Sequence, residues 1–201
     1  MREVELKAVV DDLAGTTKKL EKAGAKLLFE GSLSDSRYDV ESLELTERDE
    51  VLRIRRYEAP GSSKTYLEWK GPTETQDVYK IREEISTLVE DFESLTRILK
   101  SLGFIVTMEI DREVAQYELG SATIRFETYP RMDVLVEVEG EPDAIELAIE
   151  ALGMARGLFN SDRLPSFVER FEQRTGVRAA ICRREMEGDY SFRSEITSPS
   201  Q

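Results

Sequence analysis

Charged side chains recur at every second position in six segments of the sequence, alternating with apolar residues. Successive side chains of a strand point to opposite faces, so each charged set lies on one face of its strand. Arginines and lysines fit the oxygens of a polyphosphate, and glutamates fit a hard divalent cation. For any one strand, a solvated sheet face is the alternative, but the six together favour metal-assisted chemistry on a phosphate chain. The sets are Glu3, Glu5, Lys7; Arg53, Arg55; Glu68, Lys70; Lys80, Arg82, Glu84; Arg125, Glu127; and Glu137, Glu139.

The composition excludes several classes of site and partner. The 201 residues include no histidine, which excludes catalytic triads and acid–base catalysis that depend on an imidazole. The single cysteine, Cys182, excludes an intramolecular disulfide and favours a reducing compartment, so we expect a cytoplasmic protein. A net charge of -13 argues against binding to nucleic acid or to an anionic membrane. No apolar run is long enough for a transmembrane helix.

A strand–helix–strand unit occurs twice along the chain. Residues 2–10 alternate as a strand, Asp11 or Asp12 is placed to cap the following helix, and Gly24 is placed to end it. Asp91 and Gly103 repeat this arrangement. The two segments align without a gap at an offset of 79 residues, the separation of Gly24 and Gly103. We interpret the pattern as an internal duplication with further strands after each copy.

The two copies together predict about eight strands and two early helices. If the charged faces converge, the strands form a closed sheet around a polar interior and pack their apolar faces outward against helices. After Gly140 the pattern indicates two more helices, with Pro142 early in the first and Gly176 at the end of the second. From about residue 185 few large apolar residues remain, which predicts a loose tail.

The charged sets belong to a longer ordered series of motifs. The motifs are EVELK at the start, Tyr38-Asp39, Leu52-Arg53-Ile54-Arg55, Trp69-Lys70-Gly71-Pro72, Lys80-x-Arg82-Glu83-Glu84, LGF at 102–104 and Val136-Glu137-Val138-Glu139. This ordered series resembles the CYTH superfamily, which contains class IV adenylyl cyclases, thiamine triphosphatases and inorganic tripolyphosphatases. The WKGP, REE and LGF details look most like the class IV adenylyl cyclase branch.

The resemblance covers roughly residues 1–155 and implies an α+β fold. That fold is a closed tunnel of eight antiparallel strands made from two β-α-β repeats, with outer helices and a C-terminal helical extension. We therefore expect a tunnel domain over residues 1–155, a helical extension packed on it over 156–184 and a flexible tail over 185–201.

The resemblance also implies a function and a set of site residues. It implies an enzyme that uses Mg²⁺ or Mn²⁺ and acts on a small-molecule triphosphate, with ATP converted to cyclic AMP and pyrophosphate as the leading expectation. The alternative is a triphosphatase that hydrolyses tripolyphosphate, thiamine triphosphate or a nucleoside triphosphate. Carried over by position, the expected metal ligands are Glu3, Glu5, Glu127, Glu137 and Glu139. The expected substrate-binding residues are Lys7, Arg53, Arg55, Lys70, Lys80, Arg82, Arg112 and Arg125, and the expected catalytic residues are Lys7, Glu84 and Glu127.

Two positions depart from the family pattern. Glu127 stands where the family usually has an aspartate, and Val114 stands where it usually has a second basic residue. Arg125 shares a strand face with Glu127 and could supply the missing charge from across the tunnel. The acidic residues that precede Val114 leave a further alternative open, a polyphosphate- or nucleotide-binding protein with weak catalysis. A homodimer is also left open.

Overall fold

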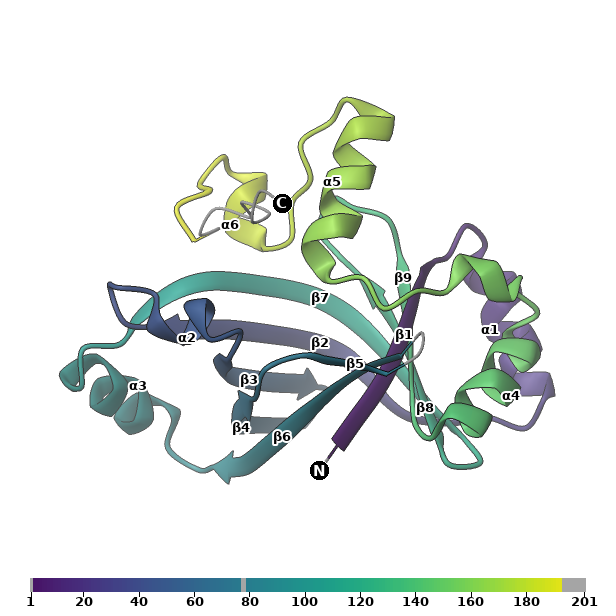
Figure 1. Ribbon diagram of the computed structural model, residues 1–201, viewed down its shortest axis with the longest axis horizontal. Coiled ribbons are helices and arrows are strands. Elements are labelled where there is room, and N and C mark those ends of the chain that lie inside the picture. The colour runs from purple at the N-terminus through teal and green to yellow at the C-terminus, as the bar shows by residue number, and fades with distance from the viewer. Residues whose placement is uncertain (1, 77–78, 193–201) are drawn as a thin grey trace.

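A computed structural model describes residues 2–76 and 79–192, and its strands close into a barrel (Figure 1). Around the barrel the strands follow the order β1-β9-β8-β7-β2-β3-β4-β6, and β1 pairs with β6 to complete the ring. Each pairing is antiparallel, and the short β5 lies beside β6. The expected closed eight-stranded antiparallel tunnel is confirmed.

The helices lie between and after the strands in chain order. The strands are β1 (Arg2–Val9), β2 (Lys26–Asp39), β3 (Val51–Ala59), β4 (Ser62–Lys70), β5 (Glu74–Gln76), β6 (Tyr79–Val89), β7 (Ile105–Leu119), β8 (Ala122–Thr128) and β9 (Leu135–Glu139). The helices are α1 (Leu13–Lys22), α2 (Glu44–Glu47), α3 (Phe92–Ser101), α4 (Pro142–Leu152), the 3-10 helix η1 (Arg156–Leu158), α5 (Leu164–Thr175) and α6 (Arg183–Met186). None of these helices is both long and apolar enough to cross a membrane.

The predicted duplication is visible in the helix caps of β1-α1-β2 and β6-α3-β7. The Asp12 carboxylate accepts a hydrogen bond from the Gly15 backbone N–H, and Asp91 accepts the equivalent bond from Ser94. Each helix is followed by a glycine with positive φ, 94° at Gly24 and 87° at Gly103, a conformation that favours glycine. The helices of both copies therefore begin at an aspartate cap and end before a glycine, as the sequence pattern predicts.

The apolar faces of the strands point outward and form the core beneath the helices. On the side of β1, β8 and β9, Leu6, Ile124 and Val138 are fully buried with residues of α1 and α4 such as Leu20 and Ile145. A second cluster joins the outer faces of β2, β3 and β4 to α3. Charged residues at the alternate positions are left to line the interior of the barrel.

The C-terminal segment packs along β7 and β9. Phe167 and Val168 of α5 lie in a cluster with Ile110 of β7 and Leu135 of β9. Residues 185–192 contact the body more than a loose tail would, since the Glu109 backbone N–H donates to the Phe192 carbonyl at 3.2 Å. The division into a tunnel domain, a packed extension and a tail stays a prediction, because residues 193–201 lie outside the described part of the chain.

Candidate active site

The interior of the barrel holds a cavity of about 200 Å³ with a surplus of positive charge. Nine lysine and arginine side chains and five carboxylates line it, a formal surplus of four positive charges in a chain whose net charge is -13. Such local concentration of cations is typical of a site for a polyanion. The charged lining residues are Lys7, Arg37, Arg53, Arg55, Lys70, Arg82, Arg112, Arg125 and Arg163, with Glu5, Asp35, Asp49, Glu127 and Glu137.

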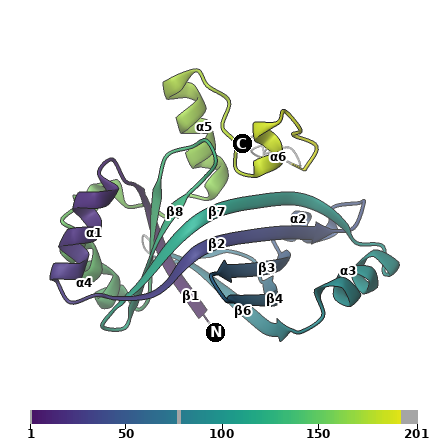
Figure 2. The ribbon, with the colours of Figure 1, turned by 180° about the vertical axis from the view of Figure 1, so that it is seen from behind.

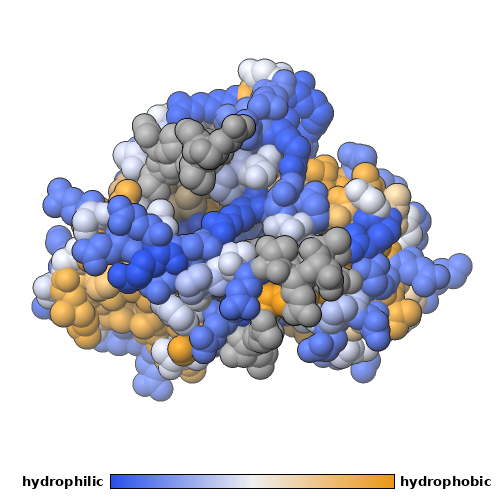
Figure 3. All heavy atoms as spheres, in the orientation of Figure 1, coloured by the Kyte–Doolittle hydropathy of each residue, from blue (hydrophilic) through white to orange (hydrophobic). Residues whose placement is uncertain are grey.

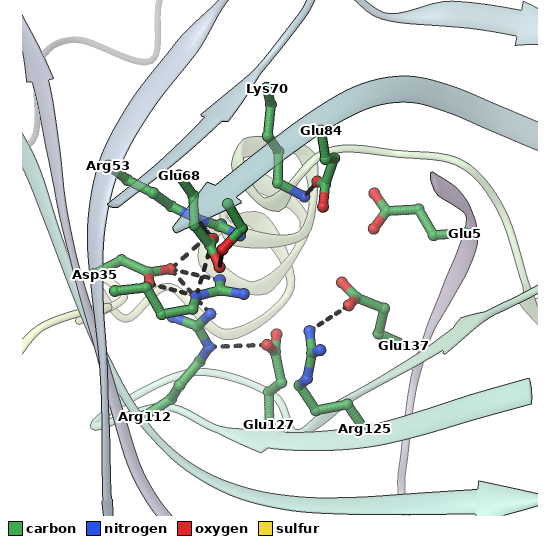
Figure 4. A network of polar contacts seen from close by, with 12 residues as sticks. Glu5, Asp35, Arg53, Glu68, Lys70, Glu84, Arg112, Arg125, Glu127 and Glu137 are labelled. Atoms are coloured by element: carbon green, nitrogen blue, oxygen red, sulfur yellow. Dashed lines mark hydrogen bonds and ion pairs between the residues drawn. The ribbon is translucent and has the colours of Figure 1, made fainter. Parts of the chain in front are cut away.

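Asp35 of β2 is the centre of the arginine cluster (Figure 4). Its carboxylate accepts hydrogen bonds from Arg55 at 2.7 and 2.8 Å and from Arg112 at 3.0 Å, and Arg53 lies 3.5 Å away. Burial alone would raise the pKa of Asp35, but the charges of Arg55 and Arg112 hold it well below its usual value. Asp35 therefore stays ionised and fixes three guanidinium groups in one place.

Glu127 extends this network along the wall of the barrel to β8, the neighbour of β7. One carboxylate oxygen accepts from Arg112 Nε at 2.8 Å, and the other accepts from the Tyr129 hydroxyl at 2.6 Å. Burial, followed by the neighbouring Glu127 charge, raises the pKa of Tyr129 well above its usual value, so the hydroxyl keeps its proton and donates. One oxygen of Glu127 thus orients Arg112, and the Tyr129 hydroxyl holds the other.

A second cluster joins β1, β8 and β9 on the other side of the cavity. The Lys7 ammonium lies 2.9 Å from Glu5 Oε1 and 2.7 Å from Glu137 Oε2, and Arg125 donates to the other oxygen of Glu137 at 2.6 Å. Burial alone lowers the pKa of Lys7, but Glu137 and Glu5 outweigh burial and raise it above the usual value. Lys7 is therefore a fixed positive charge and does not act as a proton acceptor.

The mouth of the cavity is built where the C-terminal extension meets β5 and the loop before β3. Arg163 at the start of α5 donates to Asp49 Oδ2 at 2.8 Å and to the Thr73 hydroxyl at 2.9 Å. Arg82 is fixed by two backbone carbonyls, those of Gly71 at 2.6 Å and Asp49 at 2.5 Å. Arg163 thereby brings a cation from outside the barrel to its entrance.

Two buried guanidinium nitrogens in this cavity have no hydrogen-bond partner among the described residues, namely Arg37 Nε and Arg112 Nη1. Desolvation, followed by the charge of Arg53, lowers the pKa of Arg37 to about 10, which still leaves it protonated at neutral pH. Buried donors without partners are costly, and groups of this kind need an explanation. An anionic ligand in the cavity supplies one, because its oxygens would accept from both.

Most of the residues predicted from the sequence do come together. The cavity lining includes ten of them: Glu5, Lys7, Arg53, Arg55, Lys70, Arg82, Arg112, Arg125, Glu127 and Glu137. Glu84 contacts the Lys70 ammonium beside the cavity but is not part of the lining, and Glu139 is not part of it either. Nothing is described of the side chains of Glu3 and Lys80, so these two predictions lie outside the described part of the structure.

Five charged or polar lining residues were missed from the sequence: Asp35, Arg37, Asp49, Tyr129 and Arg163. Asp35 and Arg37 have the same spacing of two that singled out the other strands, but the residues on either side of Asp35 are serines, Ser34 and Ser36. Without alternating apolar residues, this segment lacked the usual strand signal. Asp49 and Arg163 come from loops and a helix start, for which spacing along a strand gives no signal.

The departures around Val114 have a structural explanation. Val114 is 3% exposed and pairs with Glu127 across β7 and β8, so it faces the tunnel without adding charge. The acidic residues before it alternate onto the outer face, where Asp111 Oδ2 accepts from the Arg183 backbone N–H at 2.8 Å. The acidic segment therefore holds the C-terminal segment and does not add negative charge to the cavity.

This combination defines a class of protein: a closed antiparallel tunnel whose interior carries a cationic cluster and facing carboxylates. The chain belongs to the CYTH domain family, whose model matches residues 1–161. Members of this family are adenylate cyclase-like enzymes or triphosphatases that use divalent metal ions.

Individual relatives agree with this assignment. A protein of Methanocaldococcus jannaschii is 34% identical over 104 residues, which are 52% of this chain and 57% of the relative. A Vibrio parahaemolyticus structure shares the fold with a TM-score of 0.71 at 17% identity, covering 83% of this chain and 97% of that one. Both carry the name "putative adenylate cyclase".

A further solved structure shares the fold. It is a protein of Hippeastrum that matches with a TM-score of 0.57 at 15% identity, over 80% of this chain and 90% of its own. That protein is described as a putative adenylyl cyclase with a dominant triphosphatase activity.

Proposed function

We propose that this protein is a divalent-metal-dependent enzyme that binds the triphosphate chain of a small molecule inside the tunnel. The observation that carries the proposal is the pair of buried, unpartnered donors, Arg37 Nε and Arg112 Nη1, in a cavity with a surplus of positive charge. Arg53, Arg55 and Arg112 are already held in place by Asp35, so little reorganisation is needed when phosphate oxygens arrive.

Two carboxylates suit a metal ion in this setting. Among the described residues no group of three acidic or cysteine side chains is close enough to hold a metal by itself. Mg²⁺, however, is commonly held by one or two carboxylates together with substrate phosphates. Glu5 and Glu137 meet at the Lys7 ammonium from adjacent strands and provide such a pair of hard oxygen donors. We assign them as the ligands of Mg²⁺ or Mn²⁺, which would neutralise phosphate charge and polarise a phosphorus–oxygen bond.

The side chains of the tunnel then divide into three roles. Arg53, Arg55 and Arg112 bind the phosphate chain, and Lys70 and Arg82 bind it nearer the mouth. Lys7 and Arg125 stabilise negative charge that develops on the leaving phosphate oxygens, because both stay protonated. Glu127 positions Arg112 through its 2.8 Å contact and serves the reaction through that residue.

The reaction that we propose is the cyclisation of ATP. The ribose 3′-oxygen would form a bond to the α-phosphorus, the bond from that phosphorus to the β-phosphate oxygen would break, and pyrophosphate and one proton would leave. The names of the M. jannaschii and V. parahaemolyticus relatives support this reaction. Hydrolysis of the terminal phosphate is the second candidate, and the activity described for the Hippeastrum protein favours it.

One set of incubations separates these possibilities. The purified chain is incubated with ATP, thiamine triphosphate or tripolyphosphate, with Mg²⁺, with Mn²⁺ or with a chelator. Cyclic AMP with pyrophosphate identifies a cyclase, and orthophosphate identifies a triphosphatase. Arg55→Ala should lose the metal-dependent activity, whereas Arg56→Ala, on the outer face of the same strand, should keep it. That result would assign the activity to the tunnel. No product from any substrate overturns the proposed enzyme.

A further inference from the structure

The cavity has an apolar part, which lies toward its mouth and the start of α5. Four of the described residues that line it are apolar, namely Val51, Ile110, Leu164 and Pro165, and the others are charged or tyrosine. Leu164 and Pro165 begin α5, and Ile110 packs in the same cluster as Leu164. An inorganic polyphosphate has no apolar group that could use these contacts. This part of the cavity therefore suits an organic group joined to the phosphate chain.

The interior face of β3 leads from the arginine cluster to this apolar part. Arg53 and Val51 share that face, and Asp49 of the mouth comes two residues before Val51. Two residues of a strand span roughly 7 Å, a distance that a sugar can bridge between a phosphate and a base. Arg37 pairs with Arg53 across β2 and β3, and its Nε has no hydrogen-bond partner among the described residues. Donors for phosphate oxygens therefore continue up to the apolar part of the cavity.

Arg163 is fixed at the mouth through the edges of its guanidinium group. Its Nη1 lies 2.7 Å from Asp49 Oδ1, and its Nη2 donates to Asp49 Oδ2 at 2.8 Å and to the Thr73 hydroxyl at 2.9 Å. Because the N–H groups lie in the guanidinium plane, these contacts set the plane without using its faces. The side chain remains 52% exposed. A planar group that is held in this way is a surface on which an aromatic ring can stack.

We propose that Arg163 stacks on the base of a nucleoside triphosphate, with Leu164 and Pro165 as the apolar contacts beside it. The inference rests on the proposed function, because the phosphate chain must lie in the tunnel for the base to reach the mouth. It also selects among the organic triphosphates. The thiazolium ring of thiamine triphosphate is positively charged and would be repelled by the guanidinium, whereas adenine is neutral.

These three residues come from the C-terminal extension. The match to the family model ends at residue 161, two residues before Arg163. In both views of the ribbon, α5 stands apart from α1 and α4 at one end of the molecule and from α3 at the other (Figures 1 and 2). Figure 3 shows mainly hydrophilic residues on the surface below α5, so the apolar contacts for a base lie within the mouth. The choice of base is thus made by a segment outside the family match.

The test compares the binding of ATP with that of tripolyphosphate, which has no base. Both are titrated calorimetrically into the full chain, with a chelator present to prevent metal-dependent turnover. Arg163→Lys keeps the charge but loses the planar group, so the dissociation constant for ATP should rise about tenfold and that for tripolyphosphate should not change. Arg170→Lys is the matched control, because Arg170 lies on the same helix and pairs with Asp162 at the surface. It should bind both ligands as the parent does.

Leu164→Asn tests the apolar contact independently of the guanidinium. It should also weaken ATP and leave tripolyphosphate unchanged, whereas Leu158→Asn should change neither, since Leu158 is 53% exposed and does not line the cavity. If Leu164→Asn fails to fold, Arg163→Lys still decides the question, because its side chain is half exposed.

The possible failures are distinguishable. Equal losses for ATP and tripolyphosphate in Arg163→Lys, or no loss for either, would overturn the base subsite and leave the proposed function standing. Tighter binding of thiamine triphosphate than of ATP by the parent would overturn it as well. A parent that does not bind tripolyphosphate, with the chelator or with Mg²⁺, would overturn the proposed function and this inference with it.

Discussion

Asp35 and Arg55 form a buried bidentate pair, with Nε and Nη2 of the guanidinium 2.7 and 2.8 Å from the two carboxylate oxygens. The same carboxylate also contacts Arg112 and Arg53, so one negative charge holds three positive ones at the wall of the tunnel. A phosphate chain would enter a site in which these cations are already brought together against their mutual repulsion. Asp35 is therefore the residue on which the preorganisation of the site depends.

Asp35→Asn should destabilise the fold and make it dependent on anions. Loss of the charge removes the bidentate partner of Arg55 and leaves Arg53 and Arg112 with one carboxylate each, Glu68 and Glu127. Removing one partner of such a buried network costs about 3–5 kcal/mol. We expect urea unfolding to show this loss in the free energy of unfolding, and tripolyphosphate to recover part of it by replacing the missing charge. Asp11→Asn, at an exposed position, is the control. Equal stability of the two variants would contradict the central role of Asp35.

Arg55→Ala should weaken triphosphate binding by about 1.5–3 kcal/mol, the usual range for a hydrogen bond to a charged group. Isothermal titration with tripolyphosphate and with orthophosphate measures the effect, which should be much smaller for the single phosphate. Arg56→Ala is the matched control, since its guanidinium lies on the outer face, 4.4 Å from the centre of the Phe92 ring. An equal loss for both ligands would mean that Arg55 supports the structure and does not grip the chain.

Glu5→Gln should abolish metal-dependent turnover and leave the fold intact. The variant removes one carboxylate charge from the proposed metal ligands without changing the volume of the side chain. Activity with Mg²⁺ and Mn²⁺, together with the circular dichroism spectrum, checks this expectation. Glu118→Gln on the exposed part of β7 should behave like the parent. Unchanged turnover in Glu5→Gln would remove Glu5 from the site.

Stability should fall in acid partly through Glu137. Burial alone would raise the pKa of this residue, but Lys7 and Arg125 outweigh burial and hold it well below its usual value. A carboxyl group whose pKa is lower in the folded state stabilises the fold above its unfolded pKa, about 4.3 for glutamate. That stability is lost as the pH falls through the folded pKa.

Urea unfolding at a series of pH values measures this contribution. We expect a nearly constant contribution from Glu137 above roughly pH 5 and a progressive loss below about pH 4. Glu137→Gln should lose stability at neutral pH and show a shallower fall in acid than the parent. A fall as steep as the parent's would show that the ionisation of Glu137 does not contribute.

Arg125→Ala should impair tripolyphosphate binding, and adding Val114→Arg to it should restore part of the affinity. Arg125 lines the cavity at 8% exposure, and Val114 faces the same interior from β7. A guanidinium at either position would therefore reach the same space. Arg125→Ala with Val114→Met controls for the added volume. Parent-like binding by Arg125→Ala alone would show that the charge at this position is not used.

Much of the barrel and of the site was predictable from local patterns in the sequence. Alternation placed Arg53 and Arg55 on one strand face, and caps at Asp12 and Asp91 marked the two helices of the duplication. These features are local, because a strand repeats every two residues and a helix start needs one acceptor near its first N–H groups. The closed sheet followed from the requirement that several charged faces share one interior.

Only the tertiary structure decided how those charges pair. Asp35 and Arg112 are 77 residues apart in sequence, yet the register between β2 and β7 brings them to 3.0 Å. Arg163 reaches Asp49 across 114 residues because α5 packs beside the mouth of the barrel. Spacing along a strand fixes the face of a side chain but not its partner, since the partner depends on strand register and on where a distant helix docks. Local spacing therefore predicted the tunnel and its charge, whereas the fold decided that Asp35 and Glu127 hold arginines of one wall and that Glu5 and Glu137 meet at Lys7.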